Sequence, residues 1–90
     1  MIACILNRQR WKVYRVNRLG PGGTGAFGDC DFEKKTIRVV RGIEPLDELD
    51  TFIHEALHAT RPELDEDAVV TTATDIARLL WKLGYRRSDV

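Results

Sequence analysis

The sequence predicts an α+β fold in which about three antiparallel strands form a small sheet packed on two α-helices. Two observations support this prediction. The first forty residues contain short segments rich in β-branched and aromatic residues, which are typical of strands. The second half contains two segments whose apolar residues recur every three to four positions, the spacing of an amphipathic helix. A chain of 90 residues has room for one hydrophobic core, so we expect a single domain over residues 1–90.

The first predicted strand covers residues 11–19, where Trp11, Val13 and Leu19 alternate with more polar residues. Two shorter strands, about 27–32 and 36–40, flank a tight turn at residues 33–35. Residues 20–25 form a glycine-rich loop that matches the pattern GxGxxG. We reject a phosphate-binding loop, because that motif requires a helix directly after it and the residues that follow have no helical period.

The first helix is predicted from Pro45 to about Thr60, because proline suits a first helical turn and Pro62 disfavours helix in the residue before it. Its apolar stripe consists of Leu46, Leu49, Phe52, Ile53, Ala56 and Leu57. The second helix is predicted from Glu66 to about Leu83, between an N-cap and a glycine C-cap, Asp65 and Gly84. Its buried stripe is predicted to contain Val69, Val70, Ala73, Ile76, Ala77, Leu80 and Trp81.

Both histidines of the chain lie in the segment TFIHEALHAT, in a His-Glu-x-x-His pattern. On a helix, His54 and His58 lie one turn apart on the same side and can bind one zinc ion. Glu55 points about 100° away from His54, so it is placed to act on a water molecule rather than to bind the metal. A carboxylate in that position can serve as the general base of peptide hydrolysis. The spacing favours a zinc site over two unrelated surface or core-edge histidines.

The third protein ligand must be a carboxylate, because no other histidine remains. The candidates are Glu63, Asp65, Glu66 and Asp67. Glu66 shares the inward face of the second helix, where a buried carboxylate needs a partner such as zinc. Asp67 is the second choice, because helix starts are uncertain by a residue or two. Acidic residues are also common in a first helical turn without any metal.

The two cysteines, Cys4 and Cys30, are far apart and do not form a CxxC pair. We expect them to be reduced, partly buried thiols in a cytosolic protein. Cys30 is therefore a less favoured zinc ligand than the carboxylates.

The segment LDTFIHEALHA, followed by LDEDAVVTTATDIARLLWKLGYR, resembles short zincin-type metallopeptidases of phages and bacteria over about residues 28–86. More broadly it is similar to the gluzincins, whose third ligand is a glutamate on the helix after HExxH. The HExxH motif also resembles that of SprT-like domains, which act on DNA-bound proteins. The resemblance implies a minimal zincin-like fold and a zinc-dependent peptidase. It assigns His54, His58 and Glu66 as ligands of one zinc ion, and Glu55 as the base.

The sequence departs from the larger gluzincins in two ways. They place the ligand glutamate further along the chain and add a substrate-binding domain. No histidine or tyrosine is marked here as a stabiliser of the oxyanion. The candidates for that role are Tyr14, Arg61, Tyr85 and Arg86.

Charge is unevenly distributed, although the formal net charge is zero and the whole surface is therefore not built for nucleic acid. Residues 1–41 contain nine Lys/Arg against three Asp/Glu, and residues 42–67 contain one against nine. The acidic block surrounds the two histidines and suits a cation site. We expect a peptide or protein substrate. The alternative is a non-catalytic protein- or nucleic-acid-binding module with a structural or vestigial zinc, in which Trp11 and Tyr14 of the basic segment contact the partner.

No apolar run approaches the roughly 20 residues that span a bilayer. The N-terminal apolar patch has its charges after it, whereas a secretory signal has them before. We therefore expect a cytoplasmic protein without a membrane partner.

Overall fold

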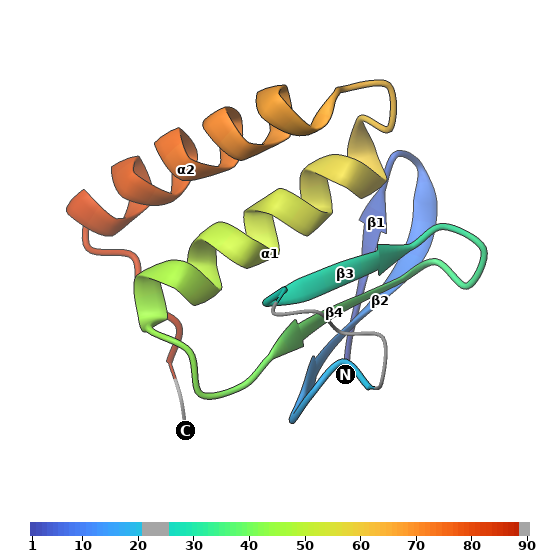
Figure 1. Cartoon of the computed structure of the whole chain (residues 1–90), viewed down its shortest axis with the longest axis horizontal. Coiled ribbons are helices and arrows are strands. Elements are labelled where there is room, and N and C mark those ends of the chain that lie inside the picture. Colours follow the sequence, from blue (N-terminus) through green and yellow to red (C-terminus); the bar gives the residue numbers. More distant parts are fainter. Residues whose placement is uncertain (21–25, 89–90) are drawn as a thin grey trace.

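The computed structural model describes residues 1–20 and 26–88, which form three layers (Figure 1). A four-stranded sheet is the first layer, helix α1 (Pro45–Thr60) packs on it, and helix α2 (Glu66–Lys82) packs on α1 from the outside. No strand of the described residues packs against α2. The predicted α+β class is confirmed, and α1 is the element that connects the two outer layers.

The sheet contains β1 (Ile2–Leu6), β2 (Gln9–Val16), β3 (Gly28–Asp31) and β4 (Thr36–Val40), in the order β1-β2-β4-β3. β1 pairs antiparallel with β2, and β3 pairs antiparallel with β4, but β2 and β4 run parallel. The prediction of three antiparallel strands is therefore wrong in two respects: there is a fourth strand, and the sheet is mixed. The predicted loop over 20–25 lies outside the described residues except for Gly20. A strand, β3, follows it, and no helix.

Local features of the chain explain both differences. β1 and β2 are joined by a two-residue turn at Asn7 and Arg8, whose φ angles are 51° and 64°. Such a turn usually contains glycine, and its absence hides the hairpin from sequence patterns. β3 is short and carries two aspartates, which suit an edge strand, whereas β4 carries the fully buried Ile37 and Val39. The β3–β4 hairpin therefore docks through β4, which places β4 beside β2 in a parallel orientation.

The core lies between the sheet and α1 and contains Trp11, Ile37, Val39 and Ala59. Trp11 is only 1% exposed. A surface contact through Trp11, which the binding-module alternative invokes, is contradicted by this burial. Because successive side chains of a strand point to opposite faces, Tyr14 lies on the outer face of the sheet.

Both helices begin at local signals that the sequence contains. Pro45 occupies the first turn of α1. Asp65 caps α2, because its side-chain oxygen Oδ1 accepts a hydrogen bond from the Ala68 amide at 2.8 Å. The predicted starts of both helices are therefore confirmed.

The end of α2 is also determined by residues close to it in the sequence. Gly84 adopts a φ of 93°, and its amide donates to the Trp81 carbonyl at 3.0 Å. The Tyr85 amide donates to the Leu80 carbonyl at 3.0 Å, and the two bonds together form a Schellman motif. Glycine is needed here because other residues rarely adopt a positive φ.

The contact face of α2 is narrower than the predicted stripe. Val69, Ala73 and Ala77 are buried. Val70 is 46% exposed and Ile76 is 38% exposed, so the prediction that they are buried is wrong. A helix that packs on a single neighbour buries a narrow face, and residues at the flanks of that face stay in solvent.

Candidate metal centre

The two histidines of α1 converge near the start of α2. The Nε2 atoms of His54 and His58 are 3.2 Å apart, and their ring centroids are 4.9 Å apart. Both side chains are about one quarter exposed, at 23% and 24%. The four-residue spacing thus brings two nitrogen donors to one point on the helix surface.

Glu66, the first residue of α2, completes the group. Its Oε1 lies 2.9 Å from Nε2 of His54, and its Oε2 lies 3.1 Å from Nε2 of His58. Ligand atoms of the three residues all lie within 4.8 Å of one another. Because Asp65 caps α2, it determines where the helix begins and therefore where Glu66 lies. The structure brings together the three residues that were predicted as ligands.

The spacing of these atoms fits a tetrahedral metal ion. Zinc bonded at about 2.0–2.1 Å would hold neighbouring ligand atoms about 3.3–3.4 Å apart. The two histidine nitrogens are 3.2 Å apart, and each lies 2.9 or 3.1 Å from a different oxygen of Glu66, so all three separations are close to that size. Three protein ligands leave a fourth position for water or substrate, which is the arrangement of catalytic rather than structural zinc sites.

The other acidic candidates do not join this group, which is the one His/Cys/Asp/Glu cluster of metal-binding geometry in residues 1–20 and 26–88. Asp65 serves as the cap. Glu63 accepts a hydrogen bond from Nε of Arg61 at 2.5 Å, and Asp67 lies outside the cluster.

Cys30 is also outside the cluster and packs against the core from β3. Burial raises the pKa of its thiol to about 11, and the negative charges of Glu55, Asp29 and Asp31 contribute to the increase. A metal ligand must be a thiolate, which this environment disfavours.

The position of Glu66 agrees with the prediction, but its environment does not. Its side chain is 63% exposed, so the expectation of a buried carboxylate is wrong. Glu66 lies at the start of an outer helix, where solvent reaches the carboxylate. Its position on the helix face, rather than any cost of burial, brings it to the histidines.

Glu55 is the buried carboxylate of the site. It is 7% exposed, and the hydrogen bonds and ion pairs of the described residues do not include it. Burial raises the pKa of Glu55 from 4.5 to about 7, and the negative charges of Asp29 and then Glu66 contribute further. Asp29 is held in place by Arg38 of β4, whose Nε donates to Oδ1 at 3.0 Å. A carboxylate with a pKa near neutrality is suited to accept and return a proton.

A hollow of about 460 Å³ opens beside these groups. Its walls come from the start of β3, from one side of α1 and from the first residue of α2: Ala26, Phe27, Gly28, Asp50, Thr51, His54, Glu55, His58 and Glu66. The three ligand candidates and the buried carboxylate therefore face one space, which is large enough for part of a peptide.

Gly28 allows β3 to approach α1 at this hollow. A Cβ atom at Gly28 would lie 2.8 Å from the Arg38 carbonyl oxygen, 2.8 Å from Cγ2 of Thr51 and 3.3 Å from Cγ of Glu55. Sequence reasoning missed this residue. A glycine inside a predicted strand is the signal that could have identified a close backbone approach.

None of the predicted oxyanion stabilisers lines the hollow. Tyr14 is on the outer face of the sheet, Arg61 pairs with Glu63, and Tyr85 and Arg86 belong to a different hollow. The four residues were candidates by type alone, and the sequence contains no spacing that relates them to the histidines.

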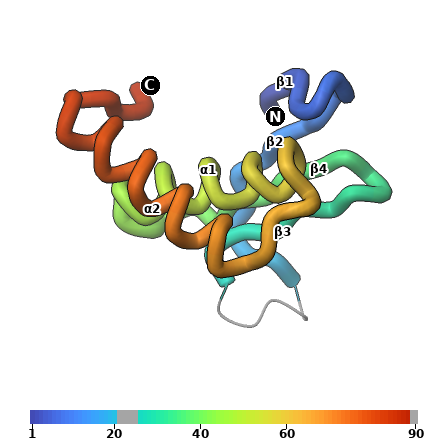
Figure 2. Tube along the Cα trace, turned by 90° about the horizontal axis from the view of Figure 1, so that it is seen from above, coloured from blue at the N-terminus to red at the C-terminus, as the bar shows by residue number. Residues whose placement is uncertain are grey.

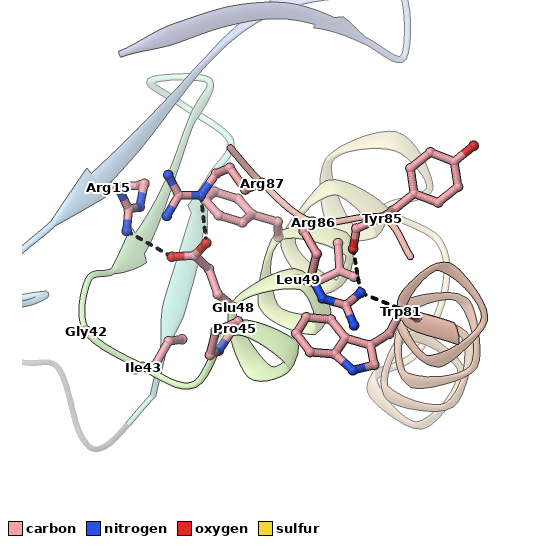
Figure 3. Close-up of a pocket in the computed structure, with 11 residues that line it drawn as sticks. Arg15, Gly42, Ile43, Pro45, Glu48, Leu49, Trp81, Tyr85, Arg86 and Arg87 are labelled. Atoms are coloured by element: carbon pink, nitrogen blue, oxygen red, sulfur yellow. Dashed lines mark hydrogen bonds and ion pairs between the residues drawn. The ribbon is translucent and has the colours of Figure 1, made fainter. Parts of the chain in front are cut away.

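The second hollow, of about 710 Å³, lies near the start of α1 and the end of α2 (Figure 3). Its lining includes Glu48, which is 7% exposed. Its carboxylate accepts hydrogen bonds from Nη2 of Arg15 at 3.1 Å and from Nε of Arg87 at 2.9 Å. Arg86 stacks on Trp81 with its guanidinium carbon 3.2 Å from the ring centroid. Through Glu48, Arg15 and Arg87 connect β2, α1 and the segment after α2.

No protein-family model, curated protein or solved structure matches this chain. Neither helix of the described residues has the length and apolar character that a bilayer-spanning segment requires. The geometry of the site is therefore the feature that indicates a function.

Proposed function

We propose that this protein is a zinc-dependent peptidase that hydrolyses an extended peptide in the hollow beside His54, His58 and Glu66. The observation that carries the proposal is the combination of a three-residue ligand group with a buried carboxylate in one hollow. A purely structural metal would need no unpaired acid beside it, and burying such an acid destabilises the fold.

The ligand chemistry favours zinc. Two imidazoles and one carboxylate form a nitrogen-and-oxygen set that zinc prefers, and a tetrahedral ion fits the observed spacing. When bound, zinc would polarise the substrate carbonyl and increase the acidity of water at the open position. The fit and the chemistry support zinc together.

Glu55 would perform the proton transfers. Its carboxylate accepts a proton from the attacking water and then donates that proton to the nitrogen of the leaving amine, so the residue returns to its starting state. In the metal-free protein the pKa of Glu55 is about 7. A bound dication would lower this pKa and so favour the carboxylate that accepts the first proton. The residue is held by α1 one position after a ligand, which keeps it beside the metal without occupying a coordination position.

The edge strand β3 offers a way to hold the substrate. The Phe27 carbonyl accepts from the Val40 amide at 2.8 Å, so its polar groups point towards β4. Because strand residues alternate, the backbone groups of Gly28 and Cys30 point to the open edge. An extended peptide that pairs with this edge would pass the hollow, and its scissile bond would lie beside Glu55.

The test separates the base from the ligands by measuring zinc content and peptide-library cleavage on the same preparations. Glu55→Gln should keep stoichiometric zinc and lose cleavage. His58→Ala should lose both, and Glu66→Gln should bind zinc more weakly. Glu63→Gln, an exposed member of the same acidic block, is the matched control and should change neither. Loss of zinc in Glu55→Gln with full zinc in Glu66→Gln would reverse the roles.

The binding-module alternative predicts a different result. Salt-dependent DNA binding by Glu55→Gln, without cleavage by the unmodified protein, would favour it. Of the two aromatic residues that this alternative invokes, the burial of Trp11 leaves only Tyr14.

A further inference from the structure

α2 carries a second apolar stripe, roughly 90° around the helix from the face that packs on α1. Ile76, Leu79 and Leu83 are 38%, 58% and 65% exposed. The half-buried Thr72 extends the stripe by one turn. At 100° per residue, these four positions fall within a sector of about 60°. Figure 1 shows α2 as the outermost layer, and the stripe lies on a lateral side of this helix, where its side chains are exposed.

Two exposed residues of opposite charge line one flank of this stripe. Asp75 and Lys82 are seven positions apart and directly precede Ile76 and Leu83. Among the described residues, neither forms an ion pair. The other flank is formed by Ala73 and Leu80, which are apolar and lie towards α1. The stripe therefore has the pattern of a short helix-pairing seam with charges on one side only.

We propose that this stripe is a self-association surface on which α2 of a second copy packs antiparallel about a twofold axis. In an antiparallel pair, each flank faces the same flank of the other helix. Asp75 of one copy then faces Lys82 of the other, and symmetry forms this ion pair twice. Parallel packing would instead place both charges against the apolar flank. Charge complementarity therefore favours a second copy in the antiparallel orientation.

The register follows from the apolar positions. Ile76 packs against Leu79 of the other copy, and Thr72 packs against Leu83. In this register, Asp75 of one copy and Lys82 of the other are offset along the helix axis by two residues, which is about 3 Å. A lysine side chain is long enough to span this offset.

The interface should be weak and independent of the metal centre. Three apolar side chains and two surface ion pairs form less contact than a standard stable interface. Glu66 lies roughly 110° around α2 from the stripe, so association leaves the candidate metal centre open. Dimerisation is therefore expected with or without zinc, and it does not depend on the proposed peptidase activity.

The experiment measures association by sedimentation velocity from roughly 10 µM to 1 mM, the range expected of a weak interface. The parent should shift from monomer to dimer. Leu79→Glu should abolish the dimer, because it places a charge in the seam. Asp75→Lys and Lys82→Asp should each weaken association roughly tenfold, because each converts two attractions into two repulsions. The double variant Asp75→Lys/Lys82→Asp should restore the parental association.

Arg78→Asp is the matched control, because it reverses an exposed charge on another side of α2 and should leave association unchanged. Circular dichroism of every variant verifies that the helices are intact. A parent that stays monomeric at 1 mM, roughly the upper limit for a weak complex, overturns the proposal. A double variant that remains as weak as the single variants overturns the antiparallel arrangement.

Discussion

Glu55 is a carboxylate that the fold holds at the cost of stability. Its pKa is about 7 in the folded protein and 4.5 ordinarily, so between these values the folded state binds more protons than the unfolded state. In the metal-free protein, protonated Glu55 thus contributes to the free energy of unfolding. This contribution is fully present below pH 4.5 and is lost as the pH rises through 7. Above pH 7, folding requires Glu55 to be buried as a negative charge near the negative charges of Asp29 and Glu66.

The first prediction concerns this charge. In the presence of a chelator, Glu55→Gln should stabilise the protein at pH 8 by up to roughly 3 kcal/mol, because the amide has no charge to bury. At pH 4 the gain should be near zero. Urea unfolding of both proteins at the two pH values measures the difference. An equal gain in stability at both pH values would show that the gain does not come from removing a buried negative charge at residue 55.

Because Gly28 has no Cβ atom, β3 can approach α1 closely beside the candidate site. The second prediction is that Gly28→Ala destabilises the protein by about 1–3 kcal/mol, because the new methyl group meets backbone and side-chain atoms at 2.8 Å. Adding Thr51→Ser removes one of those atoms, Cγ2, and should recover part of the loss. Thermal unfolding measures both variants. No recovery in the double variant would assign the strain to the Arg38 carbonyl and Glu55 rather than to Thr51.

At the scale of elements, the helices were predictable from sequence because their signals are local. Pro45, Asp65 and Gly84 act within one turn of the positions that they define. The same locality explains why Glu66 could be proposed as a ligand, since helical period and one cap determine its direction. Its exposure could not be predicted, because that depends on α2 being an outer layer.

The sheet was less predictable because strand pairing is not local. β1 was missed, since its turn lacks glycine. The parallel pairing of β2 with β4 depends on which strand of the β3–β4 hairpin docks, and alternation within a strand contains no information about its neighbour. Gly28 and Asp29 belong to the site only through this pairing, so sequence analysis did not find them.

The third prediction concerns the start of α2. Asp65→Ala should destabilise the protein by about 1 kcal/mol, because the Ala68 amide loses its side-chain acceptor. It should also weaken zinc binding, because the frayed first turn contains Glu66. Asp65→Ser, which can still cap, should preserve both properties. Calorimetric titration with zinc and thermal unfolding measure the two effects. A serine variant as impaired as the alanine variant would exclude capping as the cause.

At the scale of the whole molecule, Glu48 connects segments that are distant in sequence. Arg15 comes from β2, Glu48 from α1 and Arg87 from the segment after α2 (Figure 3). The trace in Figure 2 shows α2 returning the chain to the α1 end where this contact forms. The contact therefore ties the outer helix to the sheet, across the layer that separates them.

The fourth prediction is that Glu48→Gln destabilises the protein by on the order of 2 kcal/mol. Removing one partner of a buried ion pair costs more than this, but the two arginines are 29% and 40% exposed, so solvent compensates in part. Asp47→Asn, which removes an exposed charge from the same helical turn, is the control and should have little effect. Urea unfolding near pH 7 compares the two variants. Equal stability of the two variants would exclude Glu48 as a structural connection.

Among the elements of the described residues, α2 packs on α1 alone, and residues 61–65 join the two helices along the chain. Glu66 is therefore tethered to the histidines, and a short tether holds a group at an effective concentration of millimolar or above. A carboxylate in solution must reach comparable concentrations to replace it, so acetate should restore zinc binding to a Glu66→Ala protein only at such levels. The tether also has an opposite consequence under the proposed function: any opening of α2 away from α1 would remove the third ligand together with the helix. The lifetime of the proposed bound ion would then depend on how often α2 opens.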